Sequence, residues 1–420
     1  MSVLWETMAG LAPFIRTLPP NHVYDYEDDK YDDYESDDPG YHKSTFVIGV
    51  NRHHLASNVR FALNTQRLDH YARFIKHVTV HDKDAYYATL HDLSIHMPSG
   101  YRLLPEVRTL DIHLDAVGGP EGMDMLFGPR VDAISVRIER TDTGFRWTTV
   151  FLNKMFAICR NLRTLKIDFD LCDPEEICVI LDMMRAARPS LRALHLTFKA
   201  WIYGFKVMGT PRDSMERLLR VISGTVHDFS STIRIEPLAM QAFGLFRNLQ
   251  NLMIHLSPQA MSHLTSKGPN FLFPSLRSLE IIADNIFLDT PPFMRHLQAM
   301  HLDTLALLFI RSPSASCEDF MSDFNQSFLT CSFSGTLSVV AMHPRQRDRN
   351  MWRPPYSMMA TLLALPKLSA LYLPRQWARD DVLETIAKNR PEIQLLEHCP
   401  LHPRAFPDIP DVPLFHSQLL

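Results

Sequence analysis

Apolar residues recur along the chain in one short pattern. An apolar residue is followed by two residues of any kind, and after these, apolar residues alternate with residues of any kind. Two copies are CRNLRTLKIDF, which begins at Cys159, and RPSLRALHLTF, which begins at Arg188. The alternation predicts a short strand with one buried face and one wet face. We call the first apolar residue of each copy its anchor, and the anchors are Val78, Val107, Val131, Leu162, Leu191, Leu249, Leu276, Leu302, Leu337, Leu368 and Ile393.

The spacing of these anchors is regular. It runs from 24 to 35 residues, apart from one interval of 58 that contains the weaker copy STIRIEPLAM. With that copy included, the mean spacing is about 29 residues. A period of about 20–29 residues with an L-x-x-L-x-L core is typical of leucine-rich repeats.

The segments between the predicted strands include several with helical spacing of apolar residues. DPEEICVILDMMRAARP, which begins at Asp173, has an Asp cap, a proline in the first turn and two acids near the helix start. Ile177, Ile180, Leu181 and Met184 share one face of it. Further helices are predicted in PRDSMERLLRVISG, SMMATLLALP and RDDVLETIAKNRP.

Strands and helices that alternate in one direction predict an α/β fold. We expect an irregular leucine-rich-repeat solenoid, with parallel strands on the concave face, helices on the convex face and a helical N-terminal cap. The alternative is an ordinary α/β domain, which the repeated pattern and the lack of a phosphate-binding turn disfavour. The predicted divisions are 1–43, an N-terminal helix and an acidic loop; 44–76, a helical cap; 77–400, the solenoid; and 401–420, a proline-rich tail.

Two N-terminal segments extend this picture. Leu4, Met8, Leu11 and Ile15 have helical spacing, and RLDHYARFIKHVTV predicts a helix that leads into a strand at 77–80. Between them, residues 25–38 hold nine acids against one lysine and no aliphatic residue, so we expect a disordered loop. The loop has neither the ligand order nor the central glycine of a calcium-binding loop. Contact with a basic partner and tyrosine phosphorylation are other roles for it.

Composition and charge narrow the class of protein. The chain has 420 residues, of which 46% are hydrophobic and 21% charged, which indicates a globular protein with a sizeable core. A net charge of −4 gives no reason to expect nucleic acid or an anionic membrane as partner. The apolar runs are too short to cross a bilayer, and no secretory signal is evident. The six cysteines form no CxxC pair, which predicts reduced, buried thiols in an intracellular protein, cytoplasmic or nuclear.

Motifs for catalysis or cofactor binding are missing from the sequence. It contains no nucleophile elbow, Walker loop, dinucleotide fingerprint, zinc-protease helix or kinase signature, so we predict no enzyme, no catalytic residue and no cofactor. GGPEGMDMLFG is interpreted as a turn between repeats. His398, Cys399 and His402 lack a fourth ligand, so no metal site is predicted. The basic stretch RQRDRNMWRPP is interpreted as a solvated loop, or as one that contacts an acidic partner or the chain's own acidic run.

Function is therefore sought on the surface of the strands. In LRTLKIDF the apolar residues of the pattern point inward, so the residues that alternate with them face outward on the concave side. The outward positions mix polar residues with Met253, Ile282 and Tyr372, which is typical of protein recognition. A plain solvent-facing surface is an equally good interpretation. The candidate partner-binding residues are Asp111, His113, Arg137, Lys166, Asp168, His195, Met253, His255, Glu280 and Tyr372.

The chain resembles fungal F-box/leucine-rich-repeat-like proteins of the basidiomycete type. The resemblance covers residues 2–400 and rests on LWETMAGLAPFIRTLPP, RLDHYARFIKHVTV and LPKLSALYLPRQWARDDVLETIAKNRPEIQLLEHC, in that order. It implies a substrate receptor of a cullin-RING ubiquitin ligase, in which an F-box binds a Skp-type linker and the repeats hold the target. No F-box pattern is recognisable here, because the only early Leu-Pro, Leu18-Pro19, runs into the acidic tract.

Three functional hypotheses follow. The first is a non-enzymatic module that recognises an unidentified protein partner through the concave face of the repeats. The second is a ubiquitin-ligase substrate receptor whose F-box lies outside this chain or has been lost. The third is an enzyme with an unrecognised site, which would need acids, histidines or cysteines that converge in a pocket.

Overall fold

The computed structural model describes the greater part of the repeat region. The described residues are 6–8, 11, 23–27, 46–50, 66–80, 90–91, 93–95, 97, 100–114, 122–139, 144–170, 172–198, 212–258, 271–309, 318–344, 356–373, 384, 386 and 388–396. They fall into two compact units, unit 1 from Met1 to Leu249 and unit 2 from Gln250 to Leu420. The sequence pattern does not mark this division, since the repeats continue on both sides of it.

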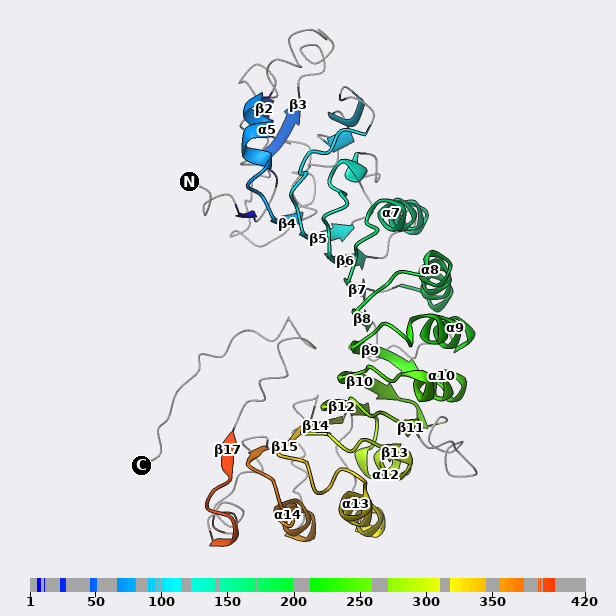
Figure 1. Ribbon diagram of the computed structural model, residues 1–420, viewed down its shortest axis with the longest axis vertical. Helices are drawn as coiled ribbons and strands as arrows, with labels where there is room; N and C mark the ends of the chain where they lie inside the picture. The colour runs from blue at the N-terminus through cyan, green and yellow to red at the C-terminus, as the bar shows by residue number, and fades with distance from the viewer. Residues whose placement is uncertain are drawn as a thin grey trace, which may run out of the picture. The chain divides into compact units, whose positions relative to one another are not determined.

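Unit 1 contains a sheet of parallel strands in chain order (Figure 1). Strands β5 to β8 pair with one another in the register that the anchor pattern predicts. The strands in the described residues are β1 Thr7–Met8, β4 His77–Val80, β5 Thr109–Leu114, β6 Ala133–Glu139, β7 Thr164–Asp170, β8 Ala193–Phe198 and β9 Asp228–Ile235.

Helices α7 to α10 lie in a row along one side of these strands (Figure 1). Their apolar faces are buried; in α8 these are the four residues that the sequence predicts, with Ile180, Leu181 and Met184 fully buried and Ile177 nearly so. The helices of unit 1 are α5 Gln66–Ala72, α7 Gly144–Ile158, α8 Pro174–Ala187, α9 Arg212–Ile222 and α10 Pro237–Ala242, with short 3-10 turns at η3 Met123–Met125 and η5 Phe243–Leu245.

Unit 2 also contains a parallel sheet, with helices α12 to α14 on one side of it (Figure 1). Its strands are β10 Asn251–Leu256, β12 Ser278–Ala283, β14 Thr304–Phe309, β15 Val339–Pro344, β16 Ala370–Tyr372 and β17 Gln394–Leu396. Its helices are α12 Ile286–His296, α13 Glu318–Thr330 and α14 Tyr356–Leu363, and β11 Phe271–Leu272 pairs with β13 Leu297–Gln298 as a separate parallel pair. In the predicted helix RDDVLETIAKNRP, Glu384, Ile386, Lys388 and Asn389 are helical.

All eleven anchors are buried, which confirms the strand pattern. Two anchors are assigned out of register. Leu371 pairs with Leu395, so the equivalent of Leu368 is Glu392, one residue before Ile393. Val78 pairs with Leu110, so the equivalent of Val107 is Ile75, three residues earlier. The doubled interval holds β9, which confirms the expected extra copy there.

The N-terminal segment differs from its predicted conformation. Thr7 and Met8 form β1, which pairs in parallel with β4, so the helix expected there is wrong at these two residues. The start of the acidic run is also ordered, because Asp25–Glu27 belong to β2 Val23–Glu27, antiparallel to β3 Phe46–Val50. Residues 28–38 lie outside the described residues, as do Leu4, Ile15 and the tail 401–420.

The glycine-rich stretch between β5 and β6 forms a turn in its described part. Gly122 has φ of +84° and precedes the short turn η3. A Cβ at this position would lie 2.2 Å from the carbonyl oxygen of Leu90, so both the backbone conformation and the contact require glycine. The turn interpretation is confirmed for residues 122–128.

Polar side chains join the loops of successive repeats in unit 1. The Nδ2 group of Asn161 donates to the carbonyl oxygen of Pro129 at 2.6 Å, and that of Asn248 donates to the carbonyl oxygen of Gly224 at 3.1 Å. Both asparagines belong to an Arg-Asn-Leu triplet that ends at an anchor. The same triplet therefore makes the same hydrogen bond to the preceding repeat in both places.

The described cysteines have free thiols. Cys159, Cys172 and Cys331 are buried, and Cys178 is half-buried. Burial raises the pKa of Cys159 and of Cys331 to about 12, so both stay protonated at neutral pH. These positions agree with the expected buried thiols, while Cys317 and Cys399 lie outside the described residues.

Candidate protein-binding face

The strands of unit 1 present outward side chains in two straight rows on the face opposite the helices. Parallel pairing in register places the same position of each repeat beside its neighbours. We call these rows the helix-free face of unit 1. The first row is Thr79, Asp111, Ser135, Lys166, His195 and Ser230, and the second is His113, Arg137, Asp168 and Thr197.

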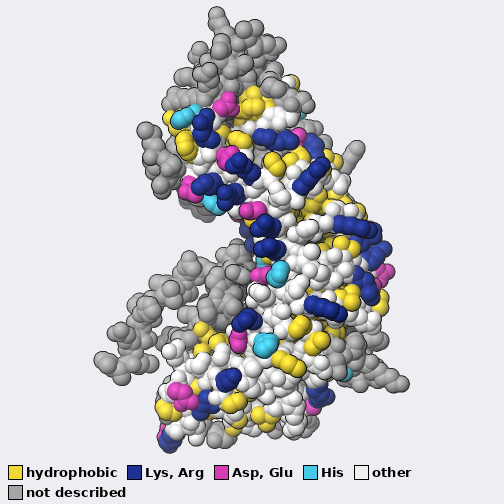
Figure 2. Space-filling model, in the orientation of Figure 1, with side chains coloured by type: hydrophobic (Ala, Val, Ile, Leu, Met, Phe, Trp, Pro, Cys, Tyr) yellow, Lys and Arg dark blue, Asp and Glu magenta, His cyan; other side chains and the backbone are white. Residues whose placement is uncertain are grey.

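Most of this face is polar and partly exposed. All six residues of the first row, and three of the four in the second, are half-buried. Lys and Arg side chains are visible over the region of β4 to β8 (Figure 2). The structure thus brings together six of the predicted site residues on one face, namely Asp111, His113, Arg137, Lys166, Asp168 and His195.

The charges in the middle of this face are only partly paired. Lys166 Nζ lies 3.0 Å from Asp168 Oδ2. The other carboxylate oxygen of Asp168 is buried without a hydrogen-bond partner, and so is Nε of Arg137 on the neighbouring strand. Asp168 itself is only 3% exposed, so the expectation that it faces solvent is wrong. In the row it lies between Arg137 and Thr197.

The equivalent rows of unit 2 have a different character. Met253, Glu280, Ala306, Ala341 and Tyr372 form the first row. The second row in unit 2 consists of His255, Ile282, Leu308 and His343.

The predicted exposure of Met253, His255, Ile282 and Tyr372 is wrong, because all four are buried. Strands of unit 2 such as TLALLF and SLEIIA have consecutive apolar residues, which is typical of strands that are buried on both faces. This signal is visible in the sequence and could have separated them from the alternating strands of unit 1.

Glu280 is the one acid in the first row of unit 2. It is half-buried, and burial raises its pKa to about 7 because the charged carboxylate loses hydration. His255, also on a unit 2 strand, is buried with Nε2 3.7 Å from Asp284 Oδ1.

The described part of the chain offers neither a metal site nor a membrane-spanning helix. Within it, no group of three or more His, Cys, Asp or Glu side chains could hold a metal ion. None of its helices has the length and apolar character needed to cross a membrane. The cluster at His398, Cys399 and His402, the loop at 345–353 and Pro374 lie outside the described residues.

Comparison of the sequence with models of protein families, and with curated proteins, finds no match.

Proposed function

We propose that the protein is a non-enzymatic interaction module that binds a protein partner through the helix-free face of unit 1. The observation that supports it is the contrast between the strand rows of the two units. The rows of unit 1 are polar and partly exposed, whereas the corresponding rows of unit 2 are mostly buried and apolar. A sheet face with rows of charged, histidine and hydroxyl side chains in fixed register offers directional contacts to a partner.

The repeats are, in this proposal, leucine-rich repeats, and the protein works inside the cell, in the cytoplasm or nucleus. The L-x-x-L-x-L core with its buried anchors supports the repeat class. The free thiols of the described cysteines support the location. The ligase-receptor function with a Skp-type linker stays a prediction that rests on the family resemblance alone.

A matched pair of double variants tests the proposal. Thr79→Lys with Ser135→Lys adds two cations on either side of Asp111, at half-buried positions of the first row. Val179→Lys with Val221→Lys adds the same charge on the exposed sides of α8 and α9, where these valines are 42% and 39% exposed.

The measurement is recovery of partner proteins from a lysate of cells that express the protein, identified by mass spectrometry. We expect the strand-face double variant to recover at least about tenfold less of a partner than the wild type does. The added charge and bulk would oppose a surface that is complementary to the wild-type face. The helix-side double variant should recover it fully. Equal recovery by both variants would overturn the proposal, provided that circular dichroism shows both folded.

A further inference from the structure

Four exposed arginines lie together where two neighbouring strands of unit 1 begin. Arg160 and Arg163 precede β7, and Arg188 and Arg192 precede β8. The backbone N–H of Arg192 donates to the carbonyl oxygen of Arg163 at 2.7 Å, which holds the two loops side by side. We call these four residues the arginine edge.

The arginine edge is not neutralised within the described part of the chain. None of its four guanidinium groups makes a hydrogen bond or ion pair there. Other arginines of the same unit are paired, such as Arg130 with Glu106 and Arg220 with Glu216. What sets this edge apart is that four unpaired arginines lie on two adjacent loops.

Nearby acids only partly offset this charge. The backbone N–H of Arg163 donates to the carbonyl oxygen of Asp132 at 2.8 Å, which places Asp132 in the adjacent loop. Asp228, the first residue of β9, lies beside Ala193 of β8 in the strand register. Four unpaired cations thus meet two acids, and a further exposed cation, Arg108, lies beyond Asp132.

The backbone at Arg188 adds a second reason to look for a ligand. Arg188 ends α8 with φ of +46°, a left-handed conformation for which glycine is the favoured residue at helix ends. An arginine here is strained, and it adds a cation next to three others. Attraction to the C-terminal end of α8 favours one cation, but it does not explain the pair that precedes β8.

We propose that the arginine edge binds an acidic segment of the protein partner. This inference rests on the proposed function and names the chemistry of the partner. Guanidinium groups bind carboxylates through paired, charge-assisted hydrogen bonds, and neighbouring parallel strands are about 4.8 Å apart. An extended segment with several Asp or Glu residues can therefore meet arginines of both loops as it crosses them.

A peptide is favoured over a nucleic acid by the surroundings of the edge. The loops CRNLR and RPSLR contain no aromatic side chain on which a base could stack. Asp111, Asp132 and Asp228 lie on the strands and loops of the same sheet, where they would repel a phosphate backbone that extended beyond the edge.

The probe for the test is a short, fluorescein-labelled peptide of alternating glutamate and serine, added to the full chain and followed by fluorescence anisotropy. The same peptide with glutamine in place of glutamate, and an oligothymidylate of similar length, are compared with it. Arg163→Gln with Arg192→Gln removes two cations of the edge. Arg73→Gln with Lys367→Gln removes two exposed cations elsewhere, which have no partner among the described residues.

We expect the glutamate peptide to bind more tightly than the glutamine peptide, and its binding to weaken as salt is raised. The edge variant should raise the Kd at least tenfold, while the control variant changes it less than twofold. The inference is overturned if the glutamate peptide binds no better than the glutamine peptide, or if both variants weaken binding equally. Tighter binding of oligothymidylate than of the glutamate peptide would also overturn it.

The outcome is separable from that of the proposed function. If Thr79→Lys with Ser135→Lys abolishes partner recovery but the edge variant leaves both peptide binding and recovery unchanged, the face binds a partner and the arginine edge does not contribute. If the edge variant alone fails to bind the glutamate peptide while the strand-face variant recovers the partner normally, the arginine edge binds acidic peptide, and the proposal for the helix-free face is wrong.

Discussion

Glu280 is a carboxylic acid among apolar neighbours in the first row of unit 2. Met253 and Ala306 lie beside it in register, and no hydrogen bond or ion pair of its carboxyl is seen in the described residues. Its pKa is raised to about 7 by burial, above an unfolded value of about 4.3. The folded state therefore holds the proton more tightly than the unfolded state does.

The sign of the resulting pH dependence follows from this raised pKa. The contribution of Glu280 to stability is complete below about pH 4.3, and it is lost as the pH rises through about 7. We expect Glu280→Gln to raise the free energy of unfolding by about 1–3 kcal/mol at pH 8 and to change it little at pH 4. Urea denaturation at both pH values measures this.

Glu175→Gln is the matched control for this prediction, because Glu175 is exposed in the first turn of α8. It should change stability by only a few tenths of a kcal/mol at either pH. If Glu280→Gln has the same effect at pH 4 as at pH 8, the carboxyl does not titrate as described.

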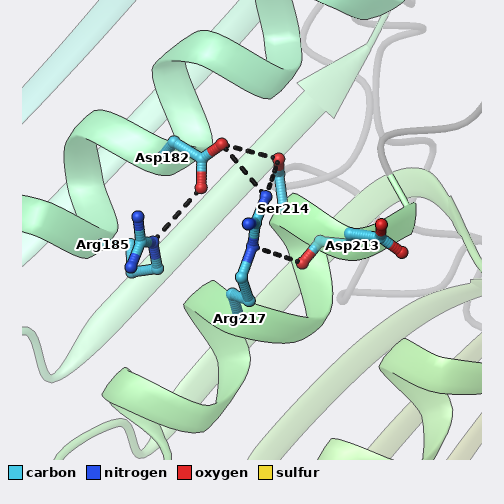
Figure 3. Close-up of polar contacts among 5 residues, drawn as sticks. All are labelled: Asp182, Arg185, Asp213, Ser214 and Arg217. Atoms are coloured by element: carbon cyan, nitrogen blue, oxygen red, sulfur yellow. Dashed lines mark hydrogen bonds and ion pairs between the residues drawn. The ribbon is translucent and has the colours of Figure 1, made fainter.

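At the scale of elements, adjacent helices of unit 1 are joined by a polar cluster around Asp182 of α8 (Figure 3). Its Oδ2 accepts from Ser214 Oγ at 2.9 Å and from Arg217 Nη2 at 3.2 Å, both on α9. Its Oδ1 accepts from Arg185 Nε at 3.2 Å. One carboxylate thus connects the two helices.

Removal of this carboxylate should loosen the contact between α8 and α9. We expect Asp182→Ala to lower the free energy of unfolding by about 1–2 kcal/mol, since the buried Ser214 hydroxyl and the half-exposed Arg217 lose an acceptor. Thermal unfolding followed by circular dichroism measures the loss.

The control is Asp213→Asn, because the carboxylate of Asp213 points away from the cluster and only its backbone carbonyl contacts Arg217 (Figure 3). It should be nearly neutral. A double-mutant cycle of Asp182→Ala with Arg217→Ala should show a coupling of about 0.5 kcal/mol or more. Additive effects of the two substitutions would show that the ion pair does not contribute.

At the scale of the whole molecule, the sequence predicts well those parts of the fold that local sequence patterns determine. The anchors and the helix at 174–187 are set by local alternation and capping, and both are confirmed. Strand β1 is only two residues long and exists because β4 offers it a partner, which no local pattern shows. The division into two units is likewise a property of long-range contacts.

The candidate site was predicted less well than the fold. The register of outward positions is correct, but exposure depends on what lies beyond the strand, and Met253, His255 and Tyr372 are buried. The arginine edge is not predicted from the sequence, although both of its loops belong to the repeated motif, in CRNLRTLKIDF and RPSLRALHLTF. Its distinguishing property is that four unpaired arginines meet on adjacent loops, and this is visible only once the loops are placed beside one another.

The stacking of repeats determines how damage in the core should spread. Among the described residues, the repeat strands of each unit pair with the strands of neighbouring repeats, so stability should be a sum of local terms. Leu165 in β7 and Leu305 in β14 are fully buried at equivalent strand positions. Replacing either with alanine leaves a cavity, which costs about 2–5 kcal/mol in well-packed cores.

We expect Leu165→Ala to lower amide hydrogen-exchange protection most in β7 and its neighbours β6 and β8, and least in β4 of the same unit. Leu305→Ala should act in the same way on β14, β12 and β15 of unit 2. Hydrogen exchange followed by mass spectrometry resolves these segments. A globular sheet with one shared core would lose protection in all strands at once. A uniform loss across the strands of a unit would therefore contradict a linear array, whereas a graded loss would support it.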